Sequence, residues 1–444
     1  MNIKTNNYIK INDIYLLLST LVLFAITFLS LPYGTGDTAE LVNSSLALKN
    51  CLSDGIFNGC ADMERFGFTP HLITLFLWSI FKDVASTISA WSLLNYILFS
   101  IIIYYFYKKS SVNKFFKISV LVFSPMIAYA TYSFSEMTFI FMIFILLLSL
   151  KEDKFLLSLI ISIFASAFKE SSFILIAALI IASIINKKDK LNLKNISLIS
   201  SSIAGLALVY IFNFYKYNQF VNDEYQTAGR VKEIDLIVSN FFGLIFSPSG
   251  GILGYFWISI VIAIIYFLLK NKDSKVSIIL GLTFLVNYIV LTFWFAPFGW
   301  VTYGPRLIMP TIVALFLFIL IFYPEFKFQF NFFIRFVIVL GNLLSSFSVL
   351  GFLINSDAFK NWLEKIIYNL PNCPKLYVWE IERVQYIQCF KSMTWETNSL
   401  PFLTLNNFAN KVFDINNFNL LSVLLIIFVI SFVVRNLIYL IKNR

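Results

Sequence analysis

The stretch LLSLKEDKFLLSLIISIFASAFKESSFILIAALIIASIINKKDK, residues 147–190, carries the pattern that decides the fold. It holds two apolar runs of about 15 residues each, which we interpret as membrane helices. KEDK precedes the first run, AFKES separates the two, and NKKDK follows the second. Because Lys and Arg concentrate on the cytoplasmic side of membrane helices, the pattern predicts a helical hairpin that starts and ends in the cytoplasm, with AFKES on the external side.

The whole chain repeats this pattern. Of its 444 residues 59% are hydrophobic and only 13% are charged, which is more apolar surface than a soluble domain of this length buries. We therefore predict an all-α polytopic membrane protein. Apolar runs of about 15 to 25 residues give about twelve transmembrane helices. These runs cover residues 14–31, 86–107, 115–132, 135–150, 154–168, 171–187, 195–214, 252–270, 276–296, 306–323, 334–354 and 417–441.

The charges between the runs agree with one orientation. With the N-terminus inside and the first run retained as a span, the basic residues of alternate gaps all fall in the cytoplasm. They are Lys108, Lys109, Lys114, Lys117, Lys151, Lys154, Lys187, Lys188, Lys190, Lys194, Lys270, Lys272, Lys275, Lys327, Arg335, Lys442 and Arg444. Both termini are then cytoplasmic. Membrane sidedness accounts for the net charge of +10, so we predict a lipid bilayer as partner and no nucleic acid.

The opposite face is predicted to carry three large loops, residues 32–85, 215–251 and 355–416. In the first, the segment from Pro70 to Phe81 is apolar but too short to cross, so we expect external juxtamembrane helices there. The Trp residues of the third loop fit either acceptor recognition or an external cap. The chain divides into a membrane domain that includes the first loop (1–354), an external loop region (355–416), and a last helix with a cytoplasmic tail (417–444).

All four cysteines lie on this external face. Cys51 with Cys60 and Cys373 with Cys389 form two local pairs. In an oxidising compartment such pairs favour two disulfides, each closing part of a loop. Four free thiols are the alternative, because sequence spacing does not show whether the Cα atoms come within bonding range.

Ionisable residues at the predicted external helix ends are the main candidates for a site. The chain has no GxxxxGK[ST], GxGxxG, HExxH or GxSxG motif and a single histidine, which argues against ATP-driven transport, a His-based metal site and Ser-His catalysis. Charge at a membrane span is costly and is usually paired or functional. The candidates are Asp37, Glu40, Glu136, Lys169, Glu170 and Arg306. Structural roles stay open for some of them: Asp37 as a helix N-cap, Lys169 with Glu170 as a self-neutralising turn, and Arg306 as a cation that extends to the interface.

Six stretches, in this order and with this sidedness, resemble GT-C-type integral membrane glycosyltransferases of the bacterial aminoarabinose and protein-mannosyl transferase-like group. They are GDTAELVNSSLALKN (36–50), FTPHLITLFLWSIF (68–81), SPMIAYATYSFSEMTFIF (124–141), FASAFKESSFIL (164–175), FFGLIFSPSGGILGYF (241–256) and GWVTYGPRLIMP (299–310). The resemblance covers about residues 14–323. Members transfer a sugar from a polyprenyl-phosphate carrier on the external face of the membrane.

The resemblance implies an inverting glycosyltransferase of the bacterial inner membrane whose active site faces the periplasm. The catalytic residues would be Asp37, as the base that takes the proton of the acceptor hydroxyl, with Glu40 and Glu136. The donor phosphate would be bound by Lys169, Arg306 and Tyr303, and the acceptor or sugar by His71 and Glu170. Many relatives have a second acidic residue where this chain has Thr38. The sequence therefore assigns no metal ligand, and a divalent metal is left open as a cofactor.

The implied partners are a polyprenyl-phosphate-linked sugar donor and a glycan, lipid or protein acceptor. A lipid-linked oligosaccharide polymerase or ligase, and a flippase-type polysaccharide export protein, are alternatives with the same kind of topology. A secondary transporter is disfavoured, because repeated halves with matching broken helices are not visible.

Overall fold

The regular secondary structure of the described part of the chain is helical. The computed structural model describes residues 3–31, 36–56, 60, 66–109, 114–131, 133, 135–189, 192–220, 230–248, 250–294, 305–354, 395, 400–413 and 419–441, without the side chains of 3–12, 36–37, 114–115 and 400–402. Within these ranges there is no strand, and Arg230 and Trp294 form one isolated bridge. The predicted all-α class is confirmed.

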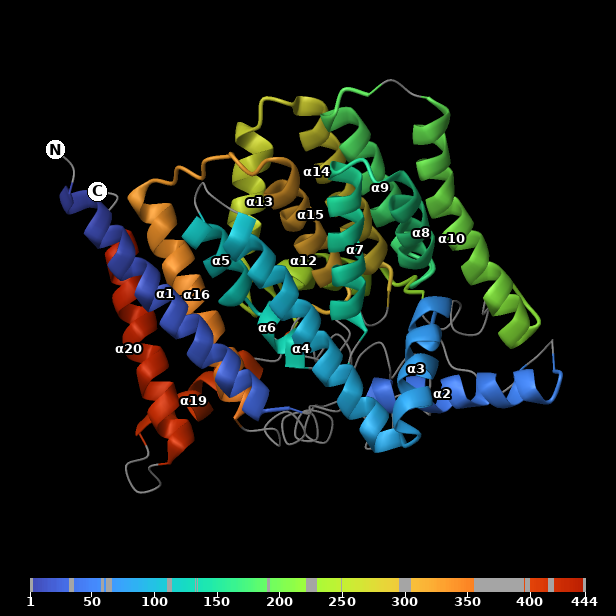
Figure 1. The fold of residues 1–444 in the computed structure, drawn as a ribbon, viewed down its shortest axis with the longest axis horizontal. Helices are drawn as coiled ribbons and strands as arrows, with labels where there is room; N and C mark the ends of the chain where they lie inside the picture. The colour runs from blue at the N-terminus through green and yellow to red at the C-terminus, as the bar shows by residue number, and fades with distance from the viewer. Residues whose placement is uncertain are drawn as a thin grey trace.

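The helices follow the predicted apolar runs, with additions in the loops (Figure 1). They are α1 (Ile3–Leu29), α2 (Gly36–Ser53), α3 (Phe68–Phe81), α4 (Val84–Lys109), α5 (Lys114–Val122), α6 (Met126–Thr131), α7 (Glu136–Lys151), α8 (Phe155–Ser166), α9 (Ser172–Asn186), α10 (Leu193–Tyr217), α12 (Ile234–Phe246), α13 (Ile258–Lys270), α14 (Ser274–Thr292), α15 (Met309–Phe322), α16 (Phe332–Leu353), α19 (Leu400–Phe413) and α20 (Leu420–Ile441). Four of them lie in segments expected to be external loops: α2 and α3 in the first, α12 in the second and α19 in the third.

Among the described residues, five helices are long and apolar enough to cross a membrane: α4, α10, α14, α16 and α20. The number of twelve spans is not confirmed, because most of the other helices are shorter. α7, α8, α9, α13 and α15 have 16, 12, 15, 13 and 14 residues. At 1.5 Å per residue these helices reach only about 18–24 Å, less than the hydrocarbon core of about 30 Å. The run at 115–132 is divided into α5 and α6 at Pro125, which has no backbone N–H to continue a helix.

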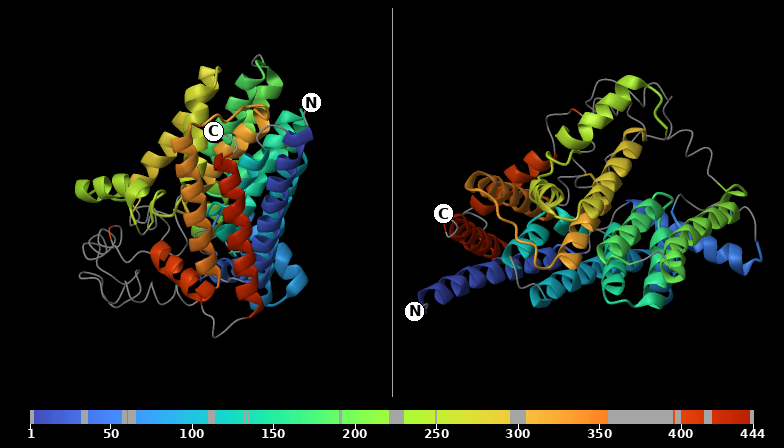
Figure 2. Two further views of the ribbon diagram at one scale, coloured as in Figure 1. Left: turned by 90° about the vertical axis from the view of Figure 1, so that its left-hand side faces the viewer. Right: turned by 90° about the horizontal axis from the view of Figure 1, so that it is seen from above.

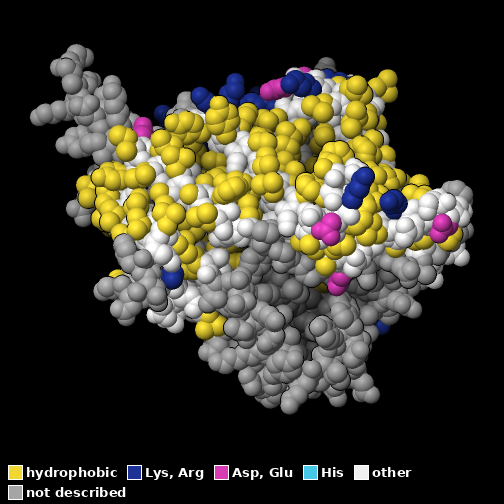
Figure 3. Space-filling model, turned by 60° about the horizontal axis from the view of Figure 1, so that its bottom comes forward, with side chains coloured by type: hydrophobic (Ala, Val, Ile, Leu, Met, Phe, Trp, Pro, Cys, Tyr) yellow, Lys and Arg dark blue, Asp and Glu magenta, His cyan; other side chains and the backbone are white. Residues whose placement is uncertain are grey.

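Basic residues gather at one edge of the helical bundle. Lys108 and Lys109 end α4, Lys151 ends α7 and Lys270 ends α13. These helix ends lie along the upper edge in Figure 1, where both chain ends also lie. Figure 3 shows Lys and Arg side chains at the upper rim of a broad hydrophobic surface. We call this the basic edge. The Lys and Arg residues gather there as expected from the predicted alternation of basic and acidic gaps along the chain.

The opposite edge carries helices that lie across the bundle or cap it. α2 runs across the lower edge in Figure 1, and α3 stands between α2 and the bundle. Leu41 of α2 packs with Leu77 of α3 and with Ala90 and Trp91 of α4, so the first predicted external loop does contain helices, and they pack on α4. Figure 2 shows α12 projecting sideways from the bundle. Trp395 donates a hydrogen bond to Ser239 of α12, over 2.9 Å.

α15 forms the centre of the bundle. Every side chain from Met309 to Ile321 is buried, which suits a helix that is apolar on all sides. At the basic edge Lys151 donates to the carbonyl oxygen of Ile321, and Lys117 donates to that of Pro324. These lysines from α7 and α5 satisfy carbonyl groups that the end of α15 leaves without helical partners.

Candidate functional site

Three short helices begin around one cavity. α7, α9 and α15 start at Glu136, Ser172 and Met309, and residues of their first turns line a cavity of about 380 Å³. Since α7 has 16 residues and ends at the basic edge, the cavity lies about 24 Å from that edge, toward the opposite side of the bundle. A helix N-terminus is equivalent to about half a positive charge. Three of them at one cavity favour an anion.

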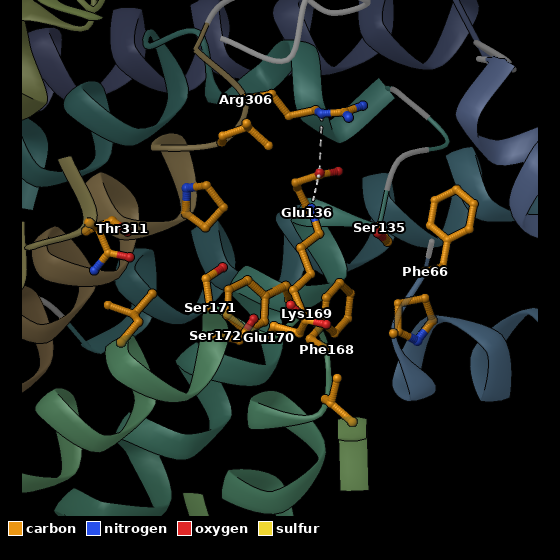
Figure 4. A pocket seen from close by; sticks show the side chains of 18 of the residues that line it. Phe66, Ser135, Glu136, Phe168, Lys169, Glu170, Ser171, Ser172, Arg306 and Thr311 are labelled. Carbon is orange, nitrogen blue, oxygen red and sulfur yellow. Dashed lines mark hydrogen bonds and ion pairs between the residues drawn. The ribbon is translucent and has the colours of Figure 1, made fainter. Parts of the chain in front are cut away.

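One carboxylate holds two cations at this cavity (Figure 4). The Lys169 Nζ lies 3.0 Å from the Glu136 Oε1, and the Arg306 Nε lies 3.5 Å from the same oxygen. The side chain of Glu136 is only 4% exposed, that of Arg306 12% and that of Lys169 40%. The other oxygen, Glu136 Oε2, is buried and makes no hydrogen bond within the described part of the chain. A buried carboxylate needs such partners, because an unpaired charge in this setting is strongly destabilising.

Glu170 takes a different partner from its neighbour Lys169. Asn213 of α10 donates to the Glu170 Oε1 over 2.8 Å. The turn between α8 and α9 therefore sends Lys169 to α7 and Glu170 to α10, and both side chains line the cavity. Among the described lining residues the charged ones are Glu136, Lys169, Glu170 and Arg306. Their formal charges cancel, so the three helix N-termini leave the cavity attractive to anions.

The rest of the cavity wall combines apolar and polar side chains. Phe139, Leu175, Val209 and Val290 contribute apolar surface from α7, α9, α10 and α14. Polar groups that were not expected from the sequence also line it: Ser171, Ser172, Asn213, Asn287 and Thr311. An isolated Asn within an apolar run is a detectable signal, since buried amides are usually hydrogen-bonded or functional.

The segment before α3 closes over the α8–α9 turn. Gly67 approaches so closely that a Cβ there would lie 2.1 Å from the carbonyl oxygen of Phe168. Thr69 donates from its hydroxyl to the Phe164 carbonyl oxygen over 2.7 Å and from its N–H to the Ala167 carbonyl oxygen over 3.3 Å. Only glycine permits this approach, and it brings Phe66, Gly67 and the turn into one cavity wall.

The first turn of α2 reaches the same region. Thr38 Oγ1 and Ser133 Oγ lie 2.8 Å apart, and both residues are buried. Ser133 lies three residues before Glu136. The backbone of α2 next to Thr38 therefore lies near the start of α7. Asp37 precedes Thr38 in this turn, and its side chain is outside the described part of the structure.

His71 is buried beside the cavity, and its neighbour Pro70 is the lining residue. Its Nδ1 and the Ser45 Oγ lie 2.8 Å apart, so the ring joins α3 to α2. Burial, with a further contribution from the nearby Lys216 cation, lowers the pKa of His71 to about 3. His71 is therefore neutral at physiological pH, and a sugar or acceptor contact through it stays a prediction.

The cysteine prediction is confirmed for one pair. Cys51 and Cys60 form a disulfide with Cα atoms 6.0 Å apart. Cys60 is buried against Leu48 and Phe212, and the Tyr215 hydroxyl donates to the Ile56 carbonyl oxygen over 2.9 Å. The closed loop is thus tied to the end of α10. Three other predicted residues, Tyr303, Cys373 and Cys389, lie outside the described ranges.

Glu40 lies half-buried in the first turns of α2. In the described part of the chain, no three His, Cys, Asp or Glu side chains come together in a group that could hold a metal ion.

Comparisons with protein-family models, curated proteins and solved structures find no match to this chain.

Proposed function

We propose that this protein is a membrane glycosyltransferase that moves a sugar from a polyprenyl-phosphate carrier to an acceptor hydroxyl on the side of the membrane opposite the basic edge. The observation that carries the proposal is the convergence of Lys169, Arg306 and three helix N-termini at one cavity with apolar walls. An anionic headgroup attached to a lipid requires this combination of positive field and apolar surface.

The depth of the cavity supports a lipid substrate. α7, α9 and α15 reach at most about 24 Å, less than the hydrocarbon core of about 30 Å, so their first turns lie below the surface of the bundle. A headgroup carried by a membrane lipid can reach such a recess from the bilayer. The number of about twelve spans and the GT-C-like arrangement belong to this proposal, as does an orientation with the basic edge in the cytoplasm.

The chemistry requires one base and an anion site. Asp37 accepts the proton of the acceptor hydroxyl while the hydroxyl oxygen attacks the anomeric carbon. The bond between that carbon and the phosphate oxygen breaks, and the electron pair leaves with the lipid phosphate. Lys169 and Arg306 stabilise the charge that develops on this phosphate. Glu136 orients the acceptor or assists Asp37, and Glu170 with Asn213 offers hydrogen-bonding groups to a sugar.

Deletion of the gene tests this function whichever sugar is transferred. Mass spectrometry of lipid-linked sugars and envelope glycans is expected to show an accumulated polyprenyl-phosphate sugar and a glycan, lipid or protein that lacks one sugar. Wild-type protein restores the profile, whereas Asp37→Asn and Lys169→Met do not. Lys154→Met, which removes an exposed lysine at the other end of α8, is the matched control and restores it.

Two outcomes contradict the proposal. Full restoration by Asp37→Asn removes the assigned base. A change in the length or the transfer of whole polysaccharide chains, with single-sugar decoration intact, favours the polymerase, ligase or export alternatives.

A further inference from the structure

We infer that Glu136 is an internal counter-ion that competes with the lipid phosphate for Lys169 and Arg306, and so promotes release of the product after each transfer. This inference rests on the proposed function and concerns the same cavity. Glu136 acts here as a positioning residue, because it contacts the two cations and acts on the phosphate through them.

The geometry makes the carboxylate a substitute for a phosphate oxygen. Lys169 donates a hydrogen bond to Glu136 Oε1 over 3.0 Å, and the Arg306 Nε lies 3.5 Å from the same oxygen as an ion pair without a hydrogen bond, so one carboxylate oxygen is the anionic partner of both cations. Carboxylate and phosphate are alternative anionic acceptors for the same Lys and Arg donors. Binding of the phosphate therefore requires the cations to be shared between the two anions.

The carboxylate is fixed, and one of the cations can move. Glu136 is 4% exposed and lies in the first turn of α7, where the helix N-terminus stabilises its negative charge. Lys169 is 40% exposed on the turn between α8 and α9, and its long flexible side chain can turn into the cavity. When the phosphate leaves, the buried carboxylate remains in place to take the cations back.

Product release is the step that needs such competition. A sugar linked to a lipid phosphate carries one negative charge on its phosphodiester, whereas the released phosphomonoester carries about −1.5 to −2 near pH 7. Two cations without a counter-ion bind the more highly charged product better than the substrate. The negative charge of Glu136 offsets this preference, so the product leaves and a new donor enters.

The direct test measures binding of polyprenyl phosphate to purified protein in nanodiscs. Glu136→Gln, which removes the charge and keeps the size, is expected to bind polyprenyl phosphate at least about tenfold more tightly than the wild type. Glu136→Asp keeps the charge and is expected to stay close to the wild type. Glu152→Gln is the matched control, since Glu152 follows the other end of α7 and lies exposed beside Lys154. Unchanged or weaker binding by folded Glu136→Gln overturns the inference.

A measurement on the wild type alone covers the case in which Glu136→Gln does not fold. Polyprenyl phosphate and its methyl ester differ by the charge that separates product from donor. The wild type is expected to bind the two within about threefold, and a preference of more than about tenfold for the monoester overturns the inference. In multiple-turnover experiments the steady-state rate of Glu136→Gln is expected to be limited by release of polyprenyl phosphate, so that added polyprenyl phosphate inhibits the variant at lower concentrations than the wild type. Absent transfer by the wild type, with these affinities as expected, refutes the proposed function and leaves the counter-ion role standing.

Discussion

Replacing Gly67 by Ala tests whether the close approach of the α3 segment positions the Lys169 turn. The backbone of Gly67 has φ −72° and ψ 175°, which alanine adopts without strain. Any effect must therefore come from contact. The added Cβ would lie 2.1 Å from the Phe168 carbonyl oxygen, 2.7 Å from its carbonyl carbon and 3.0 Å from the Ala167 carbonyl oxygen.

The size of the effect follows from these distances. Ordinary contact begins at 3.4 Å, so the segment before α3 and the α8–α9 turn must separate by the difference from 2.1 Å, about 1.3 Å. The contacting atoms belong to the backbone and cannot rotate away. Overpacking of this kind costs about 1–3 kcal/mol of stability. A misplacement of about 1 Å at a catalytic site lowers the rate by about 100-fold.

The assay combines thermal unfolding in detergent with the glycan profile of complemented cells. Gly67→Ala is expected to melt at a somewhat lower temperature and to lose most of its activity. Gly281→Ala is the matched control, because the nearest atom to its new Cβ is 4.0 Å away. Alanine also has a higher helix propensity than glycine at this position within α14. Wild-type activity in Gly67→Ala would refute the view that this contact sets the position of Lys169.

Two further predictions concern the cap formed by α2 and α3. Because the pKa of His71 is about 3 in the folded protein and about 6.5 when the ring is exposed, its stabilising effect is complete above about pH 6.5 and is lost progressively as the pH falls toward 3. Between pH 7.5 and 5 the loss amounts to about 2 kcal/mol, and melting curves of His71→Gln should lose this part of the pH dependence. Cys51→Ser opens a loop with a sequence separation of 9 residues and should lower the free energy of unfolding by about 2–3 kcal/mol. Reductant should lower the melting temperature of the wild type to that of Cys51→Ser. A reductant-insensitive wild-type melting temperature would contradict this last expectation.

Hydropathy predicted where most helices lie but did not predict how long they are. The runs at 86–107 and 195–214 correspond to α4 and α10, because long uninterrupted apolar runs have few alternatives to a helix. The run at 115–132 hides a break at Pro125, and the run at 252–270 becomes helical only at Ile258. Whether a helix continues depends on packing and on local backbone contacts that hydropathy does not measure.

The sequence predicted which charged residues form the candidate site, but not which of them contact each other. The predicted membrane orientation placed Glu136, Lys169 and Arg306 at the same depth, at the external ends of helices, because a charge within a membrane span is costly. That both cations share one oxygen of Glu136 depends on the relative rotation of α7, α15 and the α8–α9 turn. The partnership of Asn213 with Glu170 was missed because a neutral amide in an apolar helix resembles one that serves only packing.

The anchoring of α15 restricts how the protein can respond to a ligand. Lys117 and Lys151 donate to carbonyl groups at one end of α15, and its side chains are buried from Met309 to Ile321, so sliding of α15 along its axis would break these contacts. Because Arg306 lies three residues before the start of α15, we expect it to keep its position along the bundle axis when a ligand binds. We therefore expect closure of the cavity around a ligand to come from other parts of its wall, namely the α8–α9 turn and the segment before α3 that contacts this turn.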